Sequence, residues 1–567
     1  MSNENQTLEA VEHIKQDSNY LRGTIAQELR NEVTGSITPD DTQLTKFHGI
    51  YQQDDRDLRK ERAKQKLEPL YSFMIRARVP GGICQPEQWL AIDDMADRYA
   101  NGSIRITTRQ AFQFHGVIKG RLKATVAAIN QQLMDTIAAC GDVNRNVMCT
   151  ANPELSSIHQ SVYAVAQAIS DHLTPQTRAY HEIWLDGEQW TADDEADHEP
   201  IYGQTYLPRK FKTAVVIPPD NDVDVLAHDL GFVAIIKDQQ LTGFNVTVGG
   251  GMGTTHGDPA TFPLLAQTLG FCTPDQVLSV AENIVKIQRD HGDRSNRKHA
   301  RFKYTVDDHG IDWVRQQLTS RMGVPLADPQ PVQFTHNGDR FGWRQNQDGS
   351  WNHTLYITNG RVKDSADLPL KQALRAVAQV HRGDFRLTAN QNLIIARVPA
   401  QDKALIEQIL QHHGLLDAHS ATRQLSMACV ALPTCTLAMA EAERYLPDLI
   451  TQVEQLQAKH GIADRGVMIR MTGCPNGCAR PFIAEVGLVG KALGRYNLYL
   501  GGRPDGTRLN QLFAENIDEA SIIQHLDALL GQWSQQGQPQ EPFGDFVIRQ
   551  GHVQVVQHGI EVHIQNK

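Results

Sequence analysis

The sequence has no long apolar run. No stretch approaches the roughly 18 consecutive apolar residues of a membrane-spanning helix, and the chain opens on Met-Ser-Asn-Glu-Asn without the apolar segment of an export signal. We therefore expect a globular protein of the cytoplasm, with no membrane partner. In a reducing compartment its eight cysteines are expected to be metal ligands or free thiols and not disulfides.

Positive charge is in the minority. The chain has 55 Lys and Arg against 65 Asp and Glu, a net charge of -10, whereas nucleic-acid binding requires a basic surface. We therefore expect no nucleic-acid partner. The glycine-dense segment 242–253 lacks a G-x-G-x-x-G followed by a helix, which disfavours a nucleotide site there. Basic residues that do cluster in such an acidic chain indicate an anionic ligand in a specific place.

The chain repeats two motifs in the same order. The pattern Gly-x-Ile-Arg-Ile-Thr-x-x-Gln at 102–110 recurs, with Phe and Leu for the two Ile, at 383–391, and Asn-x-x-x-Gly-Gly at 245–250 recurs at 497–502. This predicts a duplicated unit of roughly 250 to 280 residues, with two halves packed about a pseudo-twofold axis and a ligand in their shared crevice. Alternating strand and helix patterns predict an α+β fold with α/β layers.

Four of the cysteines form a cluster in the sequence. Cys429 and Cys435 make a C-x5-C pair, and Cys474 and Cys478 make a C-x3-C pair around Pro-Asn-Gly, a composition typical of tight turns. Three interpretations remain open from the residues: structural zinc, a purely structural set of thiols, and four thiolates around an iron-sulfur cluster. The five-residue gap fits zinc poorly, whereas iron-sulfur clusters accept varied spacings.

The segments around the cysteines have recognisable patterns. Strands are expected at 464–471 and 482–490, and helices at 437–444 and 448–460, the second ending at Gly461. The other four cysteines, at 84, 140, 149 and 272, belong to no motif, and we expect them to be buried side chains.

Several predicted strands carry hydrogen-bond donors on one face. Arg76 and Arg78 share a side of one strand, and Lys210 and Lys212 share a side of another. The motif at 102–116 places five polar residues on one face without an acid: Arg105, Thr107, Arg109, Gln113 and His115. The pattern alone leaves ordinary solvent-facing polar residues as an alternative.

These residues carry a family resemblance. The C-x5-C pair followed by Thr-Gly-Cys-Pro-Asn-Gly-Cys-Ala-Arg at 472–480 resembles the sirohaem and [4Fe-4S] signature of the sulfite and nitrite reductase family. Tyr-Gln-Gln-Asp-Asp-Arg-Asp at 51–57 and Leu-Pro-Arg-Lys-Phe-Lys at 207–212 are similar to the haem-carrying subunits of assimilatory sulfite reductases. The resemblance extends from about Ser18 to Gly544.

The resemblance implies both cofactors and a set of site residues. Cys429, Cys435, Cys474 and Cys478 would hold the cluster, and Cys478 would also bind the sirohaem iron. The candidates for the carboxylates of the macrocycle are Arg105, Thr107, Arg109, Gln113, His115, Arg209, Arg301 and Lys303. The candidates for the substrate anion are Arg78, Arg145, Lys210 and Lys212.

The resemblance also implies an activity and a partner. The expected reaction is six-electron reduction of sulfite to sulfide for cysteine biosynthesis, with electrons from an NADPH-oxidising flavoprotein (alpha) subunit in a hetero-oligomer. A nitrite reductase of the same architecture is one alternative. A zinc- or cluster-stabilised binding protein without catalysis is another, and it leaves the donor-lined strand faces unexplained.

We expect three domains around the cofactors, preceded by an N-terminal arm that docks the partner. The expected limits are 1–70 for the arm, 71–140 with 342–415 for a central ferredoxin-like domain, 141–341 for the first sirohaem-binding half, and 416–567 for the second half with the cluster.

Overall fold

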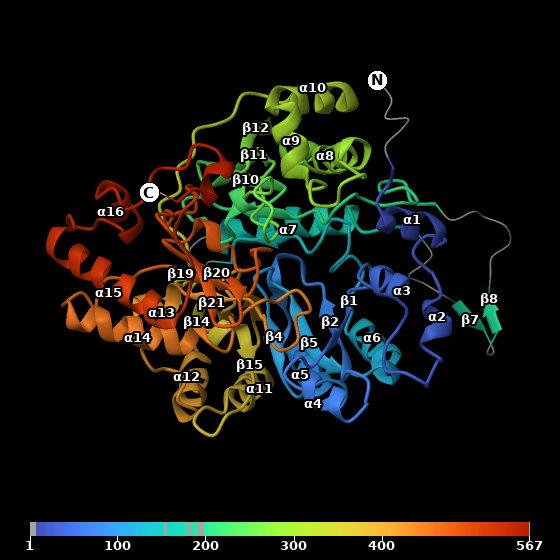
Figure 1. Ribbon diagram of the computed structural model, residues 1–567, viewed down its shortest axis with the longest axis horizontal. Helices are drawn as coiled ribbons and strands as arrows, with labels where there is room; N and C mark the ends of the chain where they lie inside the picture. The colour runs from blue at the N-terminus through green and yellow to red at the C-terminus, as the bar shows by residue number, and fades with distance from the viewer. Residues whose placement is uncertain (1–6, 152–155, 178–182, 186–187, 191–197, 566–567) are drawn as a thin grey trace.

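The computed structural model describes residues 7–151, 156–177, 183–185, 188–190 and 198–565. It contains four five-stranded sheets and a small hairpin, β7 (Ile183–Leu185) and β8 (Glu188–Trp190). In Figure 1 the blue strands of the N-terminal third lie beside the orange strands of the C-terminal third, with green helices above them. Within the described ranges, no helix combines the length and apolar character needed to cross a bilayer.

Two of the sheets form a central ferredoxin-like pair. The first has the order β1 (Ile50–Asp54), β2 (Tyr71–Ala77), β5 (Phe112–Val117), β4 (Ile104–Ile106) and β15 (Arg361–Val362). The second has the order β13 (Gly342–Gln345), β14 (Trp351–Leu355), β17 (Leu393–Val398), β16 (Asp384–Leu387) and β3 (Ile83–Cys84). Each half therefore contributes one short strand to the edge of the other sheet.

The helices of this pair bury a shared core. They are α5 (Pro86–Tyr99), α6 (Leu122–Gln131), α11 (Leu370–Val380) and α12 (Lys403–His412). A capping box of Gln85 and Gln88 starts α5, which satisfies amide groups that a helix end leaves unpaired. On α5, Trp89 packs against Phe385 of β16 with ring centroids 5.0 Å apart. One hydrophobic core thus joins both halves.

The other two sheets have the same topology as each other. Their orders are β6 (Met148–Cys149), β9 (Thr213–Val216), β10 (Leu230–Lys237), β11 (Gln240–Val248), β12 (Gln267–Cys272), and β18 (Met427–Ala428), β19 (Ile469–Thr472), β20 (Val486–Ala492), β21 (Arg495–Leu500), β22 (Gln511–Ile517). In each sheet the first three strands are parallel and the last two pairings are antiparallel.

Helices connect these strands in the same places. The crossovers between the first two strands contain α7 (Ser156–His172) and α14 (Leu446–Lys459), as parallel pairing requires a long connection. The last strands lead into α8 (Val277–His291) and α15 (Glu519–Gln536). The remaining helices are α1 (Ala10–Asp17), α2 (Ile25–Glu28), α3 (Pro39–Leu44), α4 (Arg59–Lys64), α9 (Phe302–His309), α10 (Ile311–Met322), α13 (Ala421–Leu425) and α16 (Phe543–Arg549).

The predicted duplication is confirmed at the repeated motifs. Gln110 and Gln391 both have positive φ, 51° and 71°. Their side chains reach equivalent strands, because the Gln110 amide donates to Cys149 O at 2.8 Å and the Gln391 amide donates to Ala428 O at 3.0 Å. The predicted α+β class is confirmed as well.

One local expectation is wrong. The segment 437–444 is not helical, because the amides of Met439 and Ala440 donate instead to Gly473 O, at 2.7 and 3.1 Å. Within the segment expected to be an arm, β1 pairs with β2 along its whole length.

Candidate active site and cofactor centre

The four clustered cysteines lie at the carboxyl ends of two adjacent parallel strands. Cys429 follows β18, and Cys474 and Cys478 follow β19. The Gly473 amide donates to the Cys429 sulfur at 3.3 Å, and the Asn476 side chain donates to the Cys474 sulfur at 3.6 Å. Such N–H groups favour a sulfur that carries negative charge.

The thiols influence one another electrostatically. Burial, followed by the charge of Cys478, raises the pKa of Cys429 well above its usual range and that of Cys474 to about 12. The same two causes raise the pKa of Cys435. Thiols in this environment keep their protons unless a metal compensates the thiolate charge.

The donor set is compatible with an iron-sulfur cluster. Four thiols lie on neighbouring loops that follow β18 and β19, and a four-iron cluster attaches each thiolate to a different iron.

Arg480 fixes the Cys474–Cys478 loop from both halves of the chain. Its guanidinium donates to Thr108 O at 3.0 Å and to Ala389 O at 2.9 Å, which belong to the two copies of the repeated motif. The Thr108 hydroxyl in turn donates to Cys478 O at 3.1 Å. The loop is thus held at the junction of the duplicated units.

The glycine-dense segment of the first half packs onto this loop. Thr254 N donates to Pro475 O at 2.9 Å. A Cβ on Gly477, which has a φ of 63°, would lie 3.0 Å from Met252 O. Gly477 therefore allows the cysteine loop to contact Met252 closely, a contact that the sequence did not predict.

Cys478 differs from the other three cysteines because it is exposed. Its sulfur faces a group of cations, since its charge acts on both Lys212 and Arg301. A thiolate at this place could bind a second metal centre on its open side. The predicted double role of Cys478 is compatible with this geometry.

Seven cations are linked by mutual repulsion, and two of them, Lys212 and Arg301, also respond to the charge of Cys478. We call the seven the cation chamber: Arg76, Arg109, Arg145, Arg209, Lys210, Lys212 and Arg301. Burial and then the charge of Arg109 lower the pKa of Lys212 to about 7. Burial and then Arg301 lower the pKa of Lys210 well below its usual range. Neither ammonium has a hydrogen-bond or ion-pair partner among the residues that the structure describes.

Few acids balance this charge. Asp229 faces Lys212, Arg301 and Arg109, and burial raises its pKa. Within the described chain, three guanidinium nitrogens of the chamber have no hydrogen-bond partner: Nε and Nη1 of Arg109, and Nε of Arg209. Buried charges are costly unless paired. The chamber therefore fits a ligand with several carboxylates together with a small anion.

Arg145 lies in the wall of the chamber. It donates to Gly141 O at 3.0 and 3.1 Å and lies 3.5 Å from the Tyr51 hydroxyl. The family resemblance included Tyr51 only as the first residue of the motif at 51–57, and its contact with Arg145 was not predicted. No local pattern predicts such a contact, because Tyr51 lies on β1, 94 residues from Arg145 in the sequence.

Arg78, a candidate for the substrate anion, is engaged by other side chains in this structure. Its guanidinium forms a two-pronged ion pair with Asp135 at 2.6 and 3.0 Å and donates to Ser170 and Thr174. The chamber cation from this strand is Arg76, whose charge acts on Arg109 and Tyr51. The two arginines share a strand face, but only Arg78 meets an acid.

Lys303, a candidate for the carboxylates of the macrocycle, is engaged as well, by backbone carbonyls. Its ammonium donates to Gly251 O at 3.2 Å, to Gly253 O at 2.9 Å and to Phe262 O. An ammonium has three protons, so no donor remains. Lys303 instead holds the glycine-dense segment in place.

The donor face of 105–115 divides into two groups. Arg105 forms an ion pair with Glu443 at 2.9 Å, and the Thr107 hydroxyl accepts from the amides of Arg109 and Ala111. Gln113 Oε1 and His115 Nε2 have no partner within the described residues. Arg105 and Thr107 thus bind other parts of the chain, whereas Gln113 and His115 each have one side-chain atom without a hydrogen-bond partner among the described residues.

Comparison with known proteins identifies similar chains. Two family models match: "Nitrite and sulphite reductase 4Fe-4S domain" at residues 164–326, and "Nitrite/Sulfite reductase ferredoxin-like half domain" at 65–132 and 344–413. The first match covers the half without the cysteine cluster. The other half has the same topology and contains the four cysteines.

Curated relatives match over nearly the whole chain. The "Sulfite reductase [NADPH] hemoprotein beta-component" of Anoxybacillus flavithermus is 56% identical over 98% of this chain and 97% of its own length. The protein of the same name from Myxococcus xanthus is 56% identical over 98% of each chain. The solved structure of Mycobacterium tuberculosis NirA has a TM-score of 0.78 at 23% identity over 96% of this chain and 97% of NirA, and therefore supports the fold alone.

Proposed function

The chain belongs to the nitrite and sulfite reductase family, and from this premise we propose that it reduces sulfite to sulfide as the haem-carrying component of an NADPH-dependent enzyme. It is an oxidoreductase, and its cofactors are sirohaem and a [4Fe-4S] cluster. When bound, they would relay electrons and supply the iron at which the substrate is reduced.

We propose Cys429, Cys435, Cys474 and Cys478 as the cluster ligands, with Cys478 also binding the sirohaem iron. The single observation that carries this proposal is that Cys478 is exposed and its charge acts on two chamber cations, Lys212 and Arg301. A macrocycle there would place its carboxylates among Arg109, Arg209 and Arg301. Gln113 and His115 could donate to its rim.

The substrate side of the chamber would be formed by Arg76, Arg145, Lys210 and Lys212. Reduction of sulfite consumes six electrons and six protons and releases sulfide and three waters. Each departing oxygen needs a proton and nearby positive charge. Lys212, with a pKa of about 7, suits proton donation near neutral pH, whereas arginines remain charged and bind an oxyanion with two donors.

Electrons would come from a separate NADPH-oxidising flavoprotein. The relatives are named as a beta-component of an NADPH enzyme, which supports a hetero-oligomer. The cytoplasm is the location that we propose for it. The domain limits given above are proposed for this chain too. Docking by residues before Tyr51 stays a prediction, although α1 in that segment contacts the chain itself through Lys15.

A direct experiment tests the function. Iron, acid-labile sulfide and sirohaem should be quantified on the purified chain, and sulfide production from sulfite should be measured with reduced methyl viologen as the electron source. We expect four cluster irons plus one haem iron per chain, and steady sulfide release. A colourless preparation from a host that makes sirohaem would instead favour a binding protein without catalysis.

Nitrite is the second candidate substrate, because the family models carry both names. It is also a small oxyanion whose nitrogen could meet the same cations. The ratio of kcat/KM values for sulfite and nitrite distinguishes the two. A ratio far in favour of nitrite would contradict the proposed substrate.

A further inference from the structure

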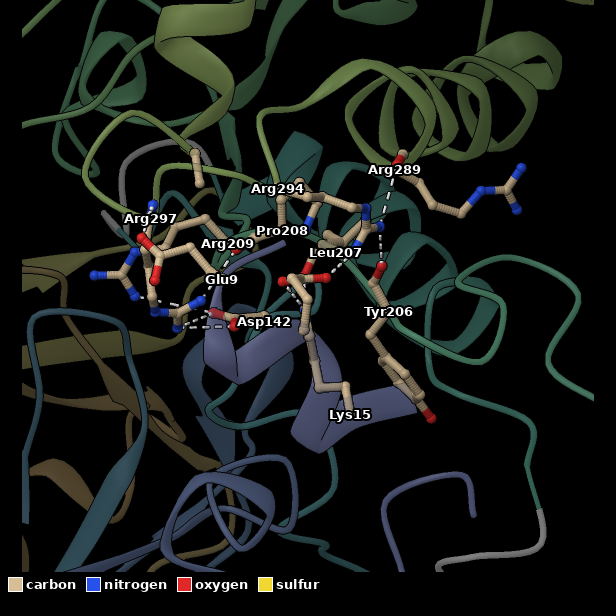
Figure 2. A network of polar contacts seen from close by, with 12 residues as sticks. Glu9, Lys15, Asp142, Tyr206, Leu207, Pro208, Arg209, Arg289, Arg294 and Arg297 are labelled. Atoms are coloured by element: carbon tan, nitrogen blue, oxygen red, sulfur yellow. Dashed lines mark hydrogen bonds and ion pairs between the residues drawn. The ribbon is translucent and has the colours of Figure 1, made fainter. Parts of the chain in front are cut away.

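Three successive backbone carbonyls, just before the chamber lysines, each accept a hydrogen bond from a different cation (Figure 2). Arg294 donates to Tyr206 O at 2.6 Å, Lys15 donates to Leu207 O at 2.8 Å, and Arg297 donates to Pro208 O at 3.1 Å. We call these contacts the carbonyl anchor. The next residues along the chain are the chamber cations of 209–212.

One member of the anchor comes from the N-terminal helix α1. Lys15 is fully buried, and its ammonium also donates to Glu12 one helical turn earlier. Burial lowers the pKa of Lys15. Glu12, only 2% exposed, binds Arg294 with its second oxygen. A single carboxylate thus supports two of the three cations.

The same network extends to the loop of Arg145. Asp142, three residues before Arg145, accepts from Arg297 at 2.8 Å and lies 3.9 Å from Arg209. Its backbone carbonyl accepts from Leu207 N at 3.1 Å. The segments that bear Arg145 and the chamber lysines are therefore joined behind the chamber by charged hydrogen bonds.

The backbone at Tyr206 has an unfavourable conformation and is followed by several like charges. Tyr206 has a φ of 55°, a conformation that side chains other than Gly rarely adopt, and its neighbours carry like charges that repel one another. The segment that leads into β9 therefore needs contacts that hold its backbone in this conformation. The carbonyl anchor supplies three charged donors at that place.

We infer that helix α1 is a positioning element of the active site: Glu12 and Lys15, acting through the carbonyl anchor, fix the backbone from which Arg209 reaches the macrocycle and Lys210 and Lys212 reach the substrate. This inference rests on the proposed function. It assigns to the N-terminal segment a role inside this chain in addition to any docking of a partner.

The test uses the full-length holoenzyme with Glu12→Gln, which keeps the side-chain shape and removes the charge. Asp384→Asn is the matched control, because Asp384 is likewise a buried acid that binds two arginines, Arg386 and Arg397, and lies outside the chamber. Hydrogen-deuterium exchange of peptides 206–216 and the KM for sulfite are measured, together with iron and sirohaem content.

We expect Glu12→Gln to speed exchange in 206–216 and to raise the KM about tenfold at unchanged cofactor content, since small displacements of binding groups have large effects. Asp384→Asn should change neither. Unchanged exchange and KM in a folded Glu12→Gln enzyme would overturn the inference. If Glu12→Gln does not fold, Arg297→Met, at a half-buried position, must show the same two changes.

The experiment distinguishes failure of the proposed sulfite reduction from failure of the positioning role of α1. Exchange is measured without substrate, so it remains informative even if the wild-type chain produces no sulfide. Deletion of residues 1–17 gives a further distinction: loss of the anchor should lower activity with both NADPH and methyl viologen. Loss of the NADPH-driven activity alone would contradict the anchor and support docking.

Discussion

Asp224 and Arg480 occupy equivalent positions in the two halves of the chain, and their side chains form a buried ion pair with each other. Each precedes a short 3-10 helix, η5 (Val225–Ala227) or η8 (Pro481–Ile483), and each has a left-handed backbone, with φ of 49° and 54°. Asp224 also binds Arg470 at 2.7 Å. The duplicated units are thus joined at a pseudo-symmetric point by opposite charges.

Replacing Arg480 by Met should destabilise the protein by about 3 to 5 kcal/mol, because it leaves part of a buried charge uncompensated, and should lower its cluster content. The same change also frees the carbonyls of Thr108 and Ala389. Thermal unfolding and iron per chain measure both effects. Arg495→Met, which removes an exposed ion pair with Asp518, is the control and should leave stability nearly unchanged.

Cys474→Ser should remove most of the cluster iron, since serine is a poor replacement for a thiolate ligand. Cys272→Ala is the control, because Cys272 is a buried core residue of β12. It should retain iron, acid-labile sulfide and the visible spectrum. Equal iron in both variants would exclude Cys474 as a ligand.

Lys212→Met should retain both cofactors and lose about 100-fold or more in sulfite turnover, the effect of losing a proton donor. The fold tolerates Met there, because the second half has Met468 at the equivalent position. The amide of each residue is bound by an equivalent acid, Asp229 at 2.9 Å and Glu485 at 2.8 Å. Near-normal sulfide production would remove Lys212 from catalysis.

The pH dependence follows from the same residue. With a pKa of about 7, Lys212 holds its proton below that pH and loses it above, so kcat for sulfite should fall as pH rises through 7. Lys212→Arg should flatten this limb, since arginine stays charged. A wild-type profile that rises steadily from pH 6 to 9 would contradict the assignment.

Arg76 and Arg78 should respond differently to replacement by Met. Arg76→Met should raise the KM for sulfite about tenfold or more, because a chamber cation is lost. Arg78→Met should leave the KM unchanged and lower the unfolding temperature, because Asp135 loses its partner. Steady-state kinetics and thermal unfolding distinguish these outcomes. A raised KM for Arg78→Met with an unchanged KM for Arg76→Met would show that Arg78, and not Arg76, contacts sulfite.

The amino-acid sequence by itself determined the chemistry and the plan of this protein. The spacing of four cysteines indicated the cluster, and the repeats at 102–110 and 383–391 indicated two halves. Strand alternation placed Lys210 and Lys212 on one face. All of this is local information, readable from neighbouring residues.

Only the tertiary structure decided which cations are available to a ligand. Alternation puts Arg76 and Arg78 on one face but does not reveal Asp135 opposite Arg78. Lys303 is occupied by carbonyls up to 52 residues away, and Arg105 by Glu443 of the other half. A charge is free or paired according to what packs against it, and that depends on contacts between segments far apart in the chain.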